Sequence, residues 1–103
     1  MKKIIIISLT SDIGKQVANY YSEKKFKILG TYRNKNLIKE FIKNKNVLLY
    51  KLDLTNKTSI KKFCNNINKN YSDWDYIIFC NGDLSPVVKF KDANFESWEN
   101  SII

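Results

Sequence analysis

Residues 3–14 read Lys-Ile-Ile-Ile-Ile-Ser-Leu-Thr-Ser-Asp-Ile-Gly, four isoleucines followed at once by small polar residues and a glycine. A continuous β-branched run is typical of a parallel strand that is buried on both faces. Helical spacing then predicts a helix over 13–25, with one apolar face formed by Ile13, Val17, Ala18 and Tyr21. This strand–turn–helix start indicates an α/β protein.

The rest of the chain repeats the alternation of strand and helix. Strands are predicted over 27–32, 47–50 and 76–80, with a short helix over 37–42 after the first of them. A longer helix, capped by Thr55, has a buried face formed by Ile60, Phe63, Cys64, Ile67 and Tyr71. A loop with Pro86 precedes a last predicted helix, whose apolar face is Phe95, Trp98 and Ile102. Right-handed crossovers turn the order βαβαβαβ-α into a doubly wound parallel sheet of about four strands in one domain, residues 1–103.

Composition excludes several kinds of site. The 103 residues include no His, which rules out His-based nucleophile triads and His-containing metal sites. Two cysteines, Cys64 and Cys80, are too few for a disulfide framework or a four-Cys zinc site, and we expect a reducing, cytoplasmic location. The apolar run at the start is shorter than the roughly 7–15 residues of an export signal, and no transmembrane span is predicted.

The net charge of +8 raises the alternative of a Lys-rich nucleic-acid-binding domain or a membrane-surface protein. Arg33 is the single arginine, and the lysines run from Lys2 to Lys91 without a dense block. Arginine is the better bidentate ligand for phosphates and guanines, so a dedicated binder is expected to use more of it. We therefore expect neither nucleic acid nor membrane as a partner.

Polar or glycine-containing segments directly follow all four predicted strands, at 8–14, 32–34, 53–55 and 80–83. Ligands of doubly wound sheets bind beyond these strand ends. In the first turn a phosphate can accept hydrogen bonds from the unpaired N–H groups of the helix start and from the Thr10 and Ser11 hydroxyls. Gly14 permits close contact between the helix and the sheet. The alternative is an ordinary helix start that Ser11 or Asp12 caps, without a ligand.

Residues 7–14 resemble the Thr-Gly-x-x-x-Gly-x-Gly turn of the short-chain dehydrogenases/reductases. Gly14 matches the last glycine, whereas Ser8 and Asp12 stand at the first and middle ones. With serine at position 8, the turn must form without a positive φ there or accept some strain.

Three further segments carry the resemblance. Asp53-Leu54 is similar to the family's Asp-(Val/Leu) pair, which contacts the adenine of the cofactor. Residues 75–82 are similar to the family's motif Asp-x-Leu-Val-Asn-Asn-Ala-Gly, in which Phe79, Cys80 and Asn81 replace Asn-Asn-Ala. Residues 90–98 look like the helix on the substrate side. The resemblance implies a Rossmann-like fold. It also implies a cofactor site formed by Ser8, Thr10, Ser11, Asp12, Ile13, Gly14, Asp53, Leu54, Cys80, Asn81 and Gly82.

The end of the second strand bears on the cofactor. NAD sites place an acidic residue about 20 residues after the glycine-rich turn, to bind the ribose 2′-hydroxyl. Here no acid lies between Glu23 and Glu40, and Arg33 stands at that distance from Gly14. A guanidinium suits a 2′-phosphate, so NADP(H) is favoured over NAD(H); the alternative is a surface arginine at a strand end.

The resemblance implies hydride transfer between NADPH and a small carbonyl or alcohol substrate. The family's catalytic Asn, Ser and Tyr-x-x-x-Lys follow the segment resembled here, so we expect the N-terminal, cofactor-binding part of a longer enzyme, not catalytic by itself. A non-catalytic nucleotide-binding or regulatory module is the alternative. Because the strand over 76–80 lacks its next neighbour, we expect an exposed edge, marginal stability and a homo-oligomer.

Overall fold

The structure is a computed structural model, and it describes residues 1–80 and 88–89. The described strands form one sheet in the order β3-β2-β1-β4-β5. The first four pair in parallel and β5 is antiparallel to β4. The strands are β1 (Lys3–Ile7), β2 (Lys27–Tyr32), β3 (Val47–Lys51), β4 (Tyr76–Phe79) and β5 (Val88–Lys89).

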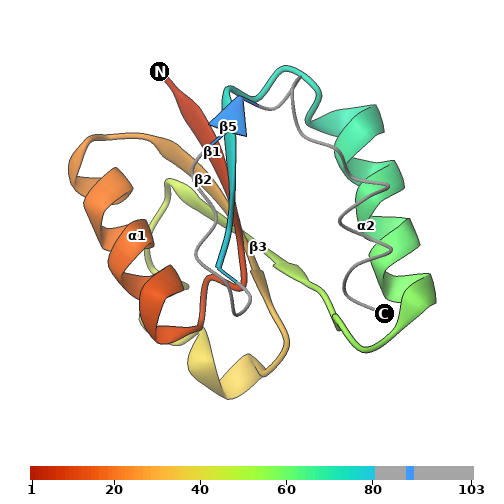
Figure 1. Cartoon of the computed structure of the whole chain (residues 1–103). Coiled ribbons are helices and arrows are strands. Elements are labelled where there is room, and N and C mark those ends of the chain that lie inside the picture. The colour runs from red at the N-terminus through yellow and green to blue at the C-terminus, as the bar shows by residue number, and fades with distance from the viewer. Residues whose placement is uncertain (81–87, 90–103) are drawn as a thin grey trace.

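The two described α-helices cover opposite faces of the sheet (Figure 1): α1 (Asp12–Glu23) and α2 (Lys57–Asn70). The β1 isoleucines alternate between two cores because successive strand side chains point to opposite faces. Ile5 and Ile7 belong to the core that contains the apolar face of α2, and Ile4 and Ile6 to the core that contains Ala18 of α1. The predicted doubly wound α/β sheet is confirmed.

The segment 37–42 is not an α-helix, contrary to the prediction. Its regular part is one 3₁₀ turn, η1 (Lys35–Leu37), and hydrogen bonds between residues three apart continue from Ile38 to Asn44. Such bonding places Ile38 and Phe41 on one side, where both are buried, and leaves Leu37 and Ile42 exposed. A segment this short forms an α-helix only with tertiary support, and the i,i+3 spacing of Ile38 and Phe41 buries both in 3₁₀-type turns as well.

Two details of the long helices also differ from the prediction. Asn56 caps α2 by accepting from the Ser59 N–H, and the Thr55 hydroxyl instead donates to Asp53 Oδ1. Ile13 is 41% exposed, because the buried face of α1 is formed by Gly14 and Ala18, the second of which lies one turn further along.

The predicted bare edge of the fourth strand is wrong for its first half. β5 pairs with β4 through Tyr76↔Lys89 and Ile77↔Val88. Pairing satisfies the backbone groups that would make such an edge prone to association. The last predicted helix, with its apolar face of Phe95, Trp98 and Ile102, lies outside the described residues, as do Asn81 and Gly82.

Candidate functional site

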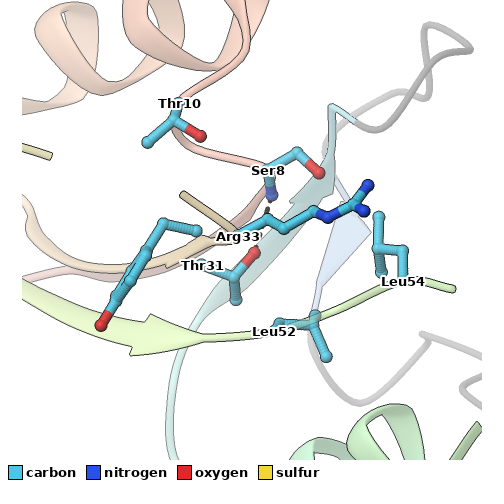
Figure 2. A pocket seen from close by; sticks show the side chains of 7 residues that line it. Ser8, Thr10, Thr31, Arg33, Leu52 and Leu54 are labelled. Atoms are coloured by element: carbon cyan, nitrogen blue, oxygen red, sulfur yellow. Dashed lines mark hydrogen bonds between the residues drawn. The ribbon is translucent and has the colours of Figure 1, made fainter. Parts of the chain in front are cut away.

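A pocket of about 140 Å³ opens beyond the carboxyl ends of β1, β2 and β3 (Figure 2). This is the edge where parallel sheets place their ligands, beside the point at which the strand order reverses from β1 to β4. Its lining consists of Ser8, Thr10, Thr31, Tyr32, Arg33, Leu52 and Leu54. The topology has thus brought together residues that are up to 46 positions apart.

The turn after β1 is held to β2 by two hydrogen bonds to one residue. The Ser8 N–H donates to Thr31 Oγ1 over 2.8 Å, and the Leu9 N–H donates to the Thr31 carbonyl oxygen over 2.9 Å. Leu9 is fully buried and packs against Gly30. Ser8 takes φ = 64°, the left-handed region, so of the two expected outcomes the turn forms with a positive φ at serine and accepts some strain.

Ser11 caps α1, as the alternative reading of the turn had it. Its hydroxyl accepts from the Gly14 N–H over 2.9 Å and lies 2.9 Å from the Ser8 carbonyl oxygen, to which it donates. Because these bonds are internal, the hydroxyl is already used within the protein. Gly14 allows the close contact that the sequence predicted: a Cβ there would collide with the Ser8 carbonyl oxygen and lie 2.7 Å from that of Leu9.

Several donors at this turn have no hydrogen-bond partner among residues 1–80 and 88–89. They are the backbone N–H groups of Thr10, Asp12 and Ile13 and the hydroxyls of Ser8 and Thr10. The N–H groups of Asp12 and Ile13 belong to the first turn of α1, where the helix dipole favours an anion. The donor set therefore suits a phosphate, apart from the exposed carboxylate of Asp12.

Arg33 is exposed and lines the pocket, and it forms no ion pair with another described residue. Asp53, after β3, is near enough to interact with it. Hydrogen bonds from the Thr55 hydroxyl and N–H, and then the charges of Arg33 and Lys51, hold the pKa of the Asp53 carboxyl below its ordinary value. Asp53 Oδ1 accepts both Thr55 bonds, at 2.6 and 2.9 Å, and no ion pair within 4.0 Å joins Asp53 to Arg33.

Cys80 follows β4 and is a buried free thiol whose pKa burial raises. A raised pKa disfavours the reactive thiolate, which agrees with a structural role. Its carbonyl oxygen lies 3.2 Å from the Ser11 hydroxyl, so the end of β4 touches the turn but does not line the pocket. Ser11, Asp12, Ile13, Gly14 and Asp53 are likewise absent from the lining, whereas Ser8, Thr10, Arg33 and Leu54 line it.

Two of the lining residues, Thr31 and Leu52, lie outside the segments predicted to border a ligand, and Tyr32 lies in one of those segments but was not predicted as a site residue. Thr31 carried a usable signal, because it is a polar residue inside an apolar strand and proves to be 2% exposed. A buried hydroxyl needs a partner, and here it accepts from the Ser8 N–H.

Two other kinds of site are absent from the described residues. No cluster of three or more His, Cys, Asp or Glu side chains could hold a metal ion there. In the same part of the chain, no helix has the length and apolar character needed to cross a membrane.

Comparison with known protein sequences points to one family. The sequence model of the short chain dehydrogenases matches residues 2–103. No curated protein sequence matches the chain.

Solved structures show the same fold. A short-chain dehydrogenase from Streptomyces avermitilis superposes with a TM-score of 0.64 at 16% identity, over 75% of this chain and 30% of that one. The structure of 4-hydroxyisoleucine dehydrogenase complexed with NADH superposes with a TM-score of 0.65 at 24% identity, over 76% of this chain and 32% of that one. Yeast methylglyoxal/isovaleraldehyde reductase complexed with NADPH superposes with a TM-score of 0.61 at 15% identity, over 75% of this chain and 26% of that one. The chain thus spans less than a third of each of these proteins.

Proposed function

Since the chain belongs to the short-chain dehydrogenase family, we propose that it binds NADP(H) and serves a reductase that passes hydride between NADPH and a small carbonyl or alcohol substrate. The cofactor supplies the hydride chemistry when bound, and the residues of this chain bind and orient it. In this proposal residues 1–103 form the cofactor-binding part of the enzyme.

The observation that carries the proposal is the position of Arg33. The single arginine of the chain lines the same pocket as Ser8 and Thr10, beyond the end of β2. Among the described residues, no acidic side chain lines this pocket to receive a ribose 2′-hydroxyl. A guanidinium in that place favours an added phosphate and a carboxylate would repel it. Both facts support NADP(H) over NAD(H).

The other cofactor contacts follow from the donors of the turn. The N–H groups of Thr10, Asp12 and Ile13 would hold the pyrophosphate at the start of α1. Ser11 and Gly14 would shape that start without touching the ligand. Asp53 and Leu54 would border the adenine, and Cys80, Asn81 and Gly82 the nicotinamide side; the last two lie outside the described residues.

Titration calorimetry with NADPH and NADH on the full chain tests the proposal. We expect NADPH to bind more tightly, and Arg33→Ala to weaken NADPH about tenfold while leaving NADH unchanged. Tenfold corresponds to about 1.4 kcal/mol, the low end for a charged hydrogen bond, because Arg33 is exposed to solvent. Lys35→Ala, which removes a nearby exposed cation outside the pocket, is the matched control.

Three results would count against the proposal. Equal affinity for the two nucleotides would remove the preference for NADP(H). An equal loss in Lys35→Ala would reduce Arg33 to a general charge effect. Salt-dependent binding of a DNA oligomer, with no nucleotide binding, would instead support the Lys-rich alternative.

A further inference from the structure

We propose that Ser8 determines cofactor specificity together with Arg33, its hydroxyl donating a second hydrogen bond to the phosphate that the guanidinium binds. The inference rests on the proposed function, and it concerns a position where the resembled motif has glycine and therefore no side chain.

Ser8 occupies a conformation that costs a serine free energy. Its φ of 64° lies in the left-handed region, where a Cβ crowds the following carbonyl oxygen. Glycine, which has no Cβ, adopts this region without that cost. The surroundings enforce this shape, because the Ser8 N–H is bonded to Thr31 Oγ1 and the Ser8 carbonyl oxygen accepts from both the N–H and the hydroxyl of Ser11. Strain of this kind, beside a pocket, is grounds for seeking a function for the side chain.

The hydroxyl of Ser8 is available for that function. It lines the pocket and has no hydrogen-bond partner among the residues that the structure describes. In Figure 2 it extends to the same side of the pocket as the Arg33 guanidinium, towards Leu54. A phosphate bound by Arg33 has oxygens left over, and a hydroxyl is a suitable second donor to them.

The other hydroxyls near the pocket are less suited. Thr31 Oγ1 already accepts from the Ser8 N–H, and the Ser11 hydroxyl is bonded within the helix cap. The Thr10 hydroxyl lines the pocket, but in Figure 2 Thr10 lies on the far side of Ser8 from Arg33. Among the serine and threonine hydroxyls at the pocket, Ser8 is therefore the one that shares a phosphate with Arg33.

Two substitutions at one position separate the hydroxyl from the strain. Ser8→Ala removes the hydroxyl and keeps a Cβ at the positive φ, whereas Ser8→Gly removes both. We expect both variants to bind NADPH about three- to tenfold more weakly in calorimetry, with NADH unchanged. In thermal unfolding, Ser8→Gly should melt a few degrees above the wild type and Ser8→Ala should not.

A double-mutant cycle with Arg33→Ala tests whether the two residues bind the same group. If they share a phosphate, Ser8→Ala costs less NADPH affinity in the Arg33→Ala background than in the wild type. Binding of adenosine 2′,5′-bisphosphate and of 5′-AMP can be compared in the same way, because these two nucleotides differ in the 2′-phosphate and lack the nicotinamide half. Ser8→Ala should weaken binding of the bisphosphate and leave binding of 5′-AMP unchanged.

The outcomes keep this inference apart from the proposed function. If Arg33→Ala weakens NADPH selectively but Ser8→Ala and Ser8→Gly bind like the wild type, the Ser8 inference is overturned and the proposed function stands. If Ser8→Ala weakens NADH equally, the hydroxyl does not read the 2′-phosphate. If the wild-type chain binds no NADPH, both fail together.

Discussion

The Ser8 N–H and the Thr31 hydroxyl oxygen, 2.8 Å apart, join the turn after β1 to the last residues of β2. Thr31 is buried, and its carbonyl oxygen also accepts from the Leu9 N–H over 2.9 Å. One residue of the second strand thus holds the backbone of the first turn, and the pocket takes its shape from that contact.

Replacing Thr31 with valine should destabilise the protein. Valine keeps the shape but cannot accept from the Ser8 N–H, and a donor left without a partner costs about 1–3 kcal/mol. Thr31→Ser, which retains the hydroxyl, is the control and should be closer to the wild type. Urea unfolding followed by circular dichroism measures both, and a Thr31→Val variant as stable as the wild type would contradict the importance of this bond.

Gly14→Ala should be strongly unfavourable although alanine is the better helix former. A Cβ would collide with the carbonyl oxygens of Ser8 and Leu9, which are backbone atoms and cannot rotate away. Overpacking of this kind costs about 1–3 kcal/mol. Gln16→Ala, at an exposed position of the same helix, should change the free energy of unfolding by less than about 0.5 kcal/mol. Similar stabilities for the two variants would show that α1 shifts freely.

Lys25→Gly should raise the stability. Lys25 follows the end of α1 with φ = 62°, a conformation that glycine adopts without the roughly 1 kcal/mol that a side chain costs there. The neighbouring Lys24 has φ = −78°, so Lys24→Gly gains nothing and should lose some stability through chain entropy. Urea midpoints of the two variants should move in opposite directions; movement in the same direction would refute this assignment of strain.

The Asp53 carboxyl should titrate below its ordinary pKa of 3.8. Because the folded pKa is the lower one, this group stabilises the fold above the ordinary value, and the contribution disappears as pH falls through the folded pKa. Thr55→Ala should raise the pKa of Asp53 more than Arg33→Ala does, since the Thr55 hydroxyl is the largest cause. Carboxyl NMR titration of the wild type and the two variants measures the Asp53 pKa in each. A larger rise in Arg33→Ala than in Thr55→Ala would contradict this assignment of causes.

Local patterns in the sequence were enough for much of the architecture. The β-branched run of β1 and the apolar face of α2 depend on side chains whose spacing is visible in the chain, and both proved buried. The segment 37–42 shows where such patterns fail. Its apolar spacing suits a helix, yet its backbone hydrogen bonds join residues three apart, and the spacing cannot separate the two because residues three apart share a face in both. Likewise, β5 has too few residues for any periodic signal, and pairing with β4 defines it.

For the candidate site, the sequence by itself determined which residues follow the strands and that an arginine, Arg33, and no acidic residue follows the second strand. The tertiary structure alone decided that Ser8 adopts a positive φ, that Thr31 holds it there, and that Ser8 and Arg33 line one pocket. The physical reason is that these features depend on contacts between β1 and β2, whose partners are more than twenty residues apart and leave no periodic trace along the chain.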